Sequence, residues 1–120
     1  MIFEQSWTGA LVSDGKAVET FPVTVPGQIQ RDYGIYKNFG DLNFMDNCKK
    51  YLEIEDFFWS YKTNIVYDKK ENERVFFVTD GIEYEYDVIL NGKVIIHHEG
   101  MFTHVEADIT EELENGAALE

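Results

Sequence analysis

The three histidines are the side chains with the most evident chemistry, and all lie between residues 97 and 104. His97 and His98 are adjacent, so on a β-strand they point to opposite faces and cannot both bind one metal ion without a distortion. Glu99 and His104 can approach one of them across a break at Gly100, which would form a His/Glu/His zinc site. The spacing matches no zinc signature, and packed or surface histidines explain it as well. We therefore expect neither a metal site nor a cofactor.

The carboxylates offer a second possible chemistry, since the chain holds 23 acidic residues. Glu83, Glu85 and Asp87 alternate and would share one face of a strand. A glycosidase pair needs two carboxyl groups about 5–9 Å apart, one of them with a pKa raised by burial. An exposed stripe lacks that asymmetry, so we expect a solvated strand face. Cys48, the single cysteine, has no neighbouring His or Asp in a nucleophile pattern, and we expect no catalytic residue.

Aromatic side chains are dense in two segments, and they have two interpretations. Sugar rings pack their C–H faces on aromatic rings, so a platform for carbohydrate is one. The core of a β-sandwich is the other, because alternate residues of one strand share a face. We favour the core. The aromatic residues concerned are Phe57, Trp59, Tyr61, Tyr84 and Tyr86.

The composition predicts a folded, acidic domain. The chain has 120 residues, of which 44% are hydrophobic and 15% aromatic, enough for one domain with a core. A net charge of −13 would repel phosphate backbones and anionic lipid, so we expect neither nucleic acid nor membrane as a partner. One cysteine excludes an internal disulfide, and no leader peptide or membrane span is visible. A cytoplasmic location is the default expectation.

The segment 81–108 organises the chain. Asn91-Gly92 between two apolar runs predicts a hairpin with a type I′ turn, which needs positive φ at both residues. The strand before the turn alternates, with its apolar side chains on one face. The strand after it, 93–98, is mostly apolar, and we expect it to be covered on both faces. The alternating apolar residues are Ile82, Tyr84, Tyr86, Val88 and Leu90.

The other elements predict an antiparallel β-sandwich with little helix. We expect a short helix at 28–33 that ends at Gly34, and a helical turn at 108–113 capped by Thr110 or Asp108. A long loop, 38–56, is the best functional candidate by position. Pro22 suits an edge strand. The expected strands are 2–7, with Trp7 as a buried anchor, 18–25, 57–67, 74–79 as a central strand, and 103–107.

Several short motifs, in order and at sensible spacing, resemble the N-terminal domain of glycoside hydrolase family 2 enzymes, closest to the β-mannosidase and β-galactosidase branches. They cover most of the chain. The motifs are Val25-Pro26-Gly27, Phe58-Trp59-Ser60-Tyr61-Lys62, Asp80-Gly81-Ile82, Val88-Ile89-Leu90-Asn91-Gly92-Lys93, His98-Glu99-Gly100-Met101-Phe102, and Asp108-Ile109-Thr110 followed by Leu113.

This resemblance implies an all-β, galactose-binding-like jelly-roll sandwich over residues 1–120, truncated at its C-terminal end and belonging to a larger glycosidase. The catalytic glutamates of such enzymes lie in a later (β/α)8 barrel, so the domain would support that barrel and border the substrate pocket. Asp46, Asn47 and Trp59 are the side chains expected near the substrate. A free-standing carbohydrate-binding module and an interaction domain without a ligand are the alternatives. Exposed sheet edges predict a homodimer.

Overall fold

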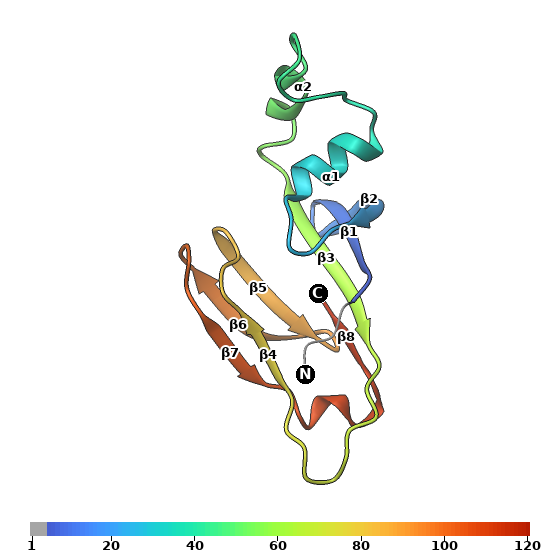
Figure 1. Ribbon diagram of the computed structural model, residues 1–120, viewed down its shortest axis with the longest axis vertical. Coiled ribbons are helices and arrows are strands. Elements are labelled where there is room, and N and C mark those ends of the chain that lie inside the picture. Colours follow the sequence, from blue (N-terminus) through green and yellow to red (C-terminus); the bar gives the residue numbers. More distant parts are fainter. Residues whose placement is uncertain (1–4) are drawn as a thin grey trace. The chain divides into compact units, whose positions relative to one another are not determined.

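The computed structural model describes residues 5–120, which form eight strands, two α-helices and one 3-10 helix (Figure 1). The described residues divide into an N-terminal unit, 5–63, and a C-terminal unit, 64–120, each compact by itself. Residues 2–4 of the expected strand 2–7 lie outside the described residues. The first described strand starts at Trp7, which is half-buried. The prediction of one domain over 1–120 stays a prediction.

The N-terminal unit contains an antiparallel sheet in the order β2-β1-β3, formed by β1 (Trp7–Ser13), β2 (Lys16–Val23) and β3 (Phe58–Ile65). The β1–β2 turn has positive φ at Asp14 (51°) and Gly15 (71°), as its sequence indicates. β2 pairs with β1 alone among the described strands. Pro22 therefore lies on an edge strand, where its missing N–H costs no sheet hydrogen bond, and that prediction is confirmed.

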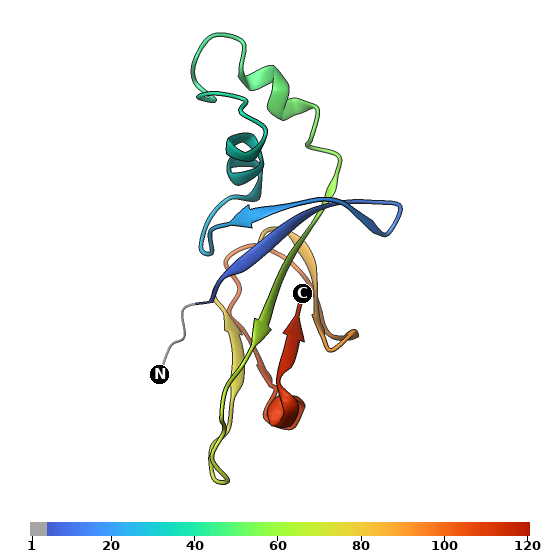
Figure 2. The ribbon, with the colours of Figure 1, turned by 90° about the vertical axis from the view of Figure 1, so that its right-hand side faces the viewer.

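Helix α1 (Ile29–Tyr36) contacts β2, and helix α2 (Cys48–Leu52) lies within the segment that leads on to β3. Both views show the two helices next to each other along this segment (Figures 1 and 2). The prediction that Gly34 ends the first helix is wrong, because α1 continues two residues further. Gly34 is buried, and a Cβ there would lie 2.2 Å from Tyr51 Oη. Glycine at this position permits the close approach of Tyr51 and does not terminate the helix.

The C-terminal unit holds the predicted hairpin, β5 (Glu85–Leu90) and β6 (Lys93–Glu99). Asn91 and Gly92 have φ values of 51° and 80°, as a type I′ turn requires. Strand β8 (Ala117–Leu119) pairs with β5 on its other side, giving the order β8-β5-β6. The Asn91 side chain accepts a hydrogen bond from the Ala118 N–H at 3.0 Å, so the turn residue also anchors β8.

Burial along the hairpin confirms only part of the predicted pattern. Val88 and Leu90 are buried and Tyr86 is half-buried, but Tyr84 precedes β5 and is 60% exposed. The prediction that 93–98 is covered on both faces is wrong. β6 pairs with β5 alone among the described strands, and Val94 is 52% exposed. An apolar, β-branched segment does not distinguish an edge strand from a central one.

Two further predictions need correction. The expected central strand is β4 (Phe76–Thr79), which pairs with β7 (Val105–Asp108) in a two-stranded sheet and leaves Phe76 47% exposed. The expected helical turn is a 3-10 helix, η1 (Glu112–Asn115), which starts later than predicted. Its N-cap is Glu111 and makes no side-chain cap, so neither Thr110 nor Asp108 has the predicted capping role.

The core of the C-terminal unit is built from side chains that point inward from β5, β8 and η1. Leu90 and Leu113 are almost completely buried, 1% and 2% exposed. Antiparallel pairing and the scarcity of helix confirm the predicted all-β class, and they are consistent with a β-sandwich. The other buried hydrophobic residues of this unit are Val88, Ile109, Ala117 and Leu119.

Candidate functional site

The aromatic residues of the N-terminal unit form a core cluster. Tyr33, in α1, lies at its centre and packs edge-on against Phe21 of β2 and Trp59 of β3, with ring centroids 5.3 Å away in both cases. Ile29 and Ile54 complete the buried group. Trp59 is half-buried against this cluster. The structure thus places Trp59 mainly in packing, as the core interpretation predicts, whereas Phe57 and Tyr84 of the same set are exposed and do not fit it.

Asp46 and Asn47 lie where the long loop enters α2, and they have different surroundings. Asp46 is exposed and forms an ion pair with Lys49 at 3.2 Å, a contact of small energetic value at the surface. The Asn47 side-chain amide donates to the Asp41 carbonyl at 2.9 Å and holds the loop together. Asn47 is therefore a structural residue of the loop, while Asp46 is exposed and makes a weak surface ion pair. The role predicted for both near a substrate stays a prediction.

The same loop presents apolar side chains to solvent. Phe44 is 63% exposed and Met45 82% exposed, next to each other at the turn that precedes α2. Met45 has a φ of 51°, so the backbone bends sharply there. Leu42 and Leu52 are also exposed. We call these four residues the apolar loop surface. Several adjacent exposed apolar side chains indicate contact with another surface.

At one edge of the aromatic cluster lies a short ion pair. Lys37 Nζ is 2.7 Å from Glu19 Oε1, and the ammonium lies 5.7 Å from the ring centroids of Tyr33 and Tyr36. The hydrogen bond to Glu19 raises the pKa of Lys37. Burial is the main cause of the raised pKa of Tyr33. Both shifts favour the protonated forms, so Lys37 stays charged and Tyr33 stays neutral at neutral pH.

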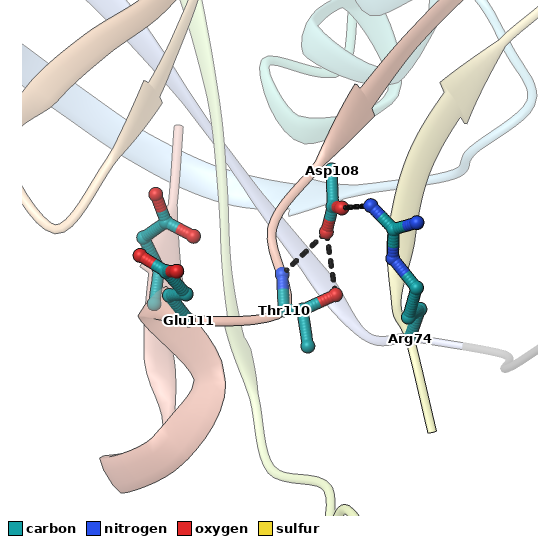
Figure 3. Close-up of a pocket in the computed structure, with 5 residues that line it drawn as sticks. Arg74, Asp108, Thr110 and Glu111 are labelled. Atoms are coloured by element: carbon teal, nitrogen blue, oxygen red, sulfur yellow. Dashed lines mark hydrogen bonds and ion pairs between the residues drawn. The ribbon is translucent and has the colours of Figure 1, made fainter. Parts of the chain in front are cut away.

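The C-terminal unit contains a polar pocket lined by Arg74, Asp108, Thr110, Glu111 and Glu112. Arg74 donates to the Asp108 carboxylate, which also accepts from the Thr110 backbone N–H at 3.1 Å and from its hydroxyl. Glu111 lies apart from this group (Figure 3). The lowered pKa of Asp108, about 2, is due first to the Thr110 hydroxyl and then to Arg74. A carboxylate held ionised in this way is a poor proton donor.

The pocket has a structural role, because Thr110 and its neighbour link two segments of the backbone. The Val75 N–H donates to Thr110 Oγ1 at 2.9 Å, and the Ile109 N–H donates to the Val75 carbonyl at 2.9 Å. These bonds join the segment after β7 to the segment before β4. The sequence predicts Thr110 or Asp108 as a helix cap, and it contains no signal for the contact with Arg74, which is distant in sequence.

Two exposed histidines each pair with a carboxylate. His97 Nδ1 is 2.6 Å from Asp87 Oδ1, and His104 Nδ1 is 2.6 Å from Asp80 Oδ1. Each hydrogen bond raises the pKa of its histidine. His98 points to the opposite face from His97 and lies against Tyr86, with ring centroids 5.6 Å apart. The opposite orientation predicted for the adjacent histidines is confirmed.

The grouping of Glu99 with His104 that the sequence left open is not found among the described residues. The nearest carboxylates to His104 are those of Asp80 and Glu106, the latter 3.6 Å from Nε2. The ligand atoms of Glu85, His97 and Glu99 instead lie within 4.8 Å of one another. Glu83, Glu85 and Asp87 are all exposed, as the predicted acidic stripe requires. Glu85 and Asp87 also lie beside the His97 side chain.

No α-helix within residues 5–120 is long and apolar enough to cross a membrane. Fold and site together define an antiparallel all-β domain in which several charged side chains pair across neighbouring strands and loops. The chain belongs to the glycosyl hydrolase 2 galactose-binding domain-like family, which it matches over residues 7–120. The resemblance drawn from the motifs is therefore confirmed.

The chain is also similar to two proteins named beta-mannosidase, one from Rattus norvegicus and one from Mus musculus. Each is 26% identical to it over 106 residues, which is 82% of this chain. The matched part is 12% of the length of each relative, so the chain spans a small fraction of the proteins that it resembles.

The pKa of Asp108 can be used to test the contacts that Arg74 and Thr110 make with its carboxylate. The folded-state pKa of Asp108, about 2, lies below its ordinary value of 3.8. The stabilisation that it contributes is thus complete above the ordinary value and is lost as the pH falls toward 2. Thr110→Val and Arg74→Met should each raise the pKa of Asp108 toward 3.8, as measured by carboxyl NMR titration. Glu111→Gln is the control and should change this pKa little. An unchanged pKa in both variants would contradict the assignment.

Proposed function

We propose that this chain is a non-catalytic, N-terminal domain of a larger family 2 glycoside hydrolase, similar to β-mannosidases and β-galactosidases, which hydrolyses O-glycosyl bonds. Membership of the galactose-binding-like family and similarity to two beta-mannosidases support this assignment. The match covers only 12% of the length of each relative, so we place the catalytic residues in other parts of the parent enzyme. Within residues 5–120, the carboxylates of Asp41, Asp80, Asp87 and Asp108 form hydrogen bonds that hold loops or strands together.

The exposed apolar loop surface is the observation that supports this proposal, because it indicates that the domain packs against another domain of the parent enzyme. Exposing Phe44 and Met45 to water in a solitary domain costs roughly 25 cal/mol for each Å² of apolar area. Covering them by a neighbouring domain would recover this free energy. The remaining domains of the parent enzyme are therefore the proposed partners. Asp46, next to Met45, would then lie at the border of the substrate pocket, with Asn47 fixing the loop and Trp59 supporting it from the aromatic cluster.

The double variant Phe44→Ser/Met45→Ser tests domain docking. In the isolated chain we expect a change in unfolding free energy of no more than about 0.5 kcal/mol, because both side chains are exposed. In the parent enzyme we expect a lower melting temperature and faster proteolytic release of this domain, because the covered surface has become polar. Both are measured by differential scanning fluorimetry and limited proteolysis.

Val18→Ser is the matched control for that variant, since Val18 is 59% exposed on β2 and outside the loop. It should leave the parent enzyme unchanged. Equal effects of the loop variant and the control, or no effect of the loop variant on the parent enzyme, would refute docking through the loop.

A free-standing carbohydrate-binding module is the second candidate, favoured by Tyr36, which is 49% exposed and stacks on Phe21 at 5.6 Å. Titration of the isolated chain with mannose, galactose and their oligomers distinguishes the two functions. We expect no binding in calorimetry and no hydrolysis of aryl glycosides. Saturable binding that Tyr36→Ala abolishes would favour the module, and hydrolysis would show that the chemistry lies within this chain.

We further propose that the isolated chain dimerises through the free edge of β6. Strand β6 has a neighbour on one side only among the described strands, and its unpaired backbone groups can pair with a second copy. Repulsion between two chains of net charge −13 opposes this association and is screened by salt. Sedimentation velocity should therefore show a dimer fraction that rises with concentration and with salt. A monomer under all these conditions would exclude the dimer.

A further inference from the structure

The outward face of the β5–β6 hairpin carries a square of four side chains that can ligate metal. Strand pairing sets Glu85 opposite Glu99, and Asp87 opposite His97. Each strand contributes two residues at i and i+2, so all four point to the same side of the sheet. All four are exposed and accessible to an ion from solvent.

The atoms are arranged as a carboxylate–histidine–metal triad requires. His97 Nδ1 is 2.6 Å from Asp87 Oδ1, so an N–H on Nδ1 donates to that carboxylate. The second ring nitrogen, Nε2, then bears the lone pair and lies 4.0 Å from Glu85 Oε1. Carboxylates bonded to the non-ligating nitrogen are typical of metal-binding histidines, because they fix the tautomer and the ring orientation.

The separations suit a small ion. The ligand atoms of Glu85, His97 and Glu99 lie within 4.8 Å of one another. Zinc binds such nitrogen and oxygen ligands at about 2.0–2.2 Å, which places tetrahedral ligand atoms roughly 3.4 Å apart. Rotation of two exposed glutamate side chains closes the difference. Three protein ligands leave a fourth position for water.

We propose that Glu85, His97 and Glu99 bind one divalent ion of the zinc class, with Asp87 orienting the histidine. Imidazole as a ligand selects zinc over calcium and magnesium, which prefer sites composed of oxygen atoms alone. The bound ion joins β6 to β5 through their side chains and reduces the negative charge of this face. The sequence alone led us to expect no metal site, and the grouping of Glu85, His97 and Glu99 is the observation that changes this.

His104 provides an internal comparison. Its Nδ1 also contacts a carboxylate at 2.6 Å, that of Asp80, but its Nε2 has a single glutamate nearby, Glu106 at 3.6 Å. The two exposed histidines therefore share the same type of orienting contact and differ in the number of further carboxylate ligands. The proposal requires zinc to bind at His97 in preference to His104.

The test is a zinc titration of the full chain after treatment with a chelator, at neutral pH. Calorimetry should give one equivalent of Zn²⁺, and NMR should show the Nε2 resonance of His97 shifting while that of His104 stays unchanged. His97→Ala and Glu99→Gln should each weaken binding at least about tenfold, and Asp87→Ala about tenfold through the lost orientation. His104→Ala is the matched control and should bind zinc as the parent chain does.

Circular dichroism identifies any variant that does not fold. The zinc affinities of the folded variants then test the proposed ligands. Zinc should also raise the melting temperature of the chain but not of His97→Ala, since an ion that binds only the folded state stabilises it. Undiminished zinc binding in His97→Ala, calcium or magnesium binding as tight as zinc, or no binding at about 1 mM Zn²⁺ would overturn the proposal.

Discussion

The C-terminal unit depends on the positive φ angles of Asn91 and Gly92. Only residues that tolerate this conformation form a two-residue turn whose twist matches the flanking strands. Once the turn is fixed, Leu90 pairs with Lys93 and the register of the hairpin follows. The same asparagine binds the Ala118 N–H and thereby adds β8 to the sheet. One local backbone requirement thus sets the position of three strands.

A β-bulge then decides which side chains face outward. Ile89 pairs with Val94, but Val88 pairs with Ile96, so β6 carries one additional residue, Ile95. Without this bulge His97 would lie opposite Tyr86 on the inward face, and His98 would point to solvent. The bulge reverses that arrangement and sets His97 opposite Asp87. The proposed metal site therefore depends on a one-residue shift that no turn residue specifies.

This shift marks the limit of prediction from the sequence. The turn, the alternation in β5 and the opposite faces of His97 and His98 were predictable, because each follows from local backbone geometry. The face on which each histidine lies was not, because a run of apolar β-branched residues contains no signal for a bulge. Gly34 gave a comparable failure. Its sequence context suggested a helix end, whereas the contact that requires glycine comes from Tyr51, seventeen positions later.

The motifs that identify the family and the residues of the two candidate binding surfaces overlap only at Glu99. The motifs that identify the family, such as the segment that contains Trp59, lie largely in strands and turns that build the fold. Apolar exposure, in contrast, concentrates in the loop around Met45, and ligand-type side chains gather on the hairpin face around His97. Neither group is needed for the cores of the two units, since its side chains are exposed. Side chains that do not serve packing are free to serve binding, and this separation is the physical reason for seeking function on these two surfaces.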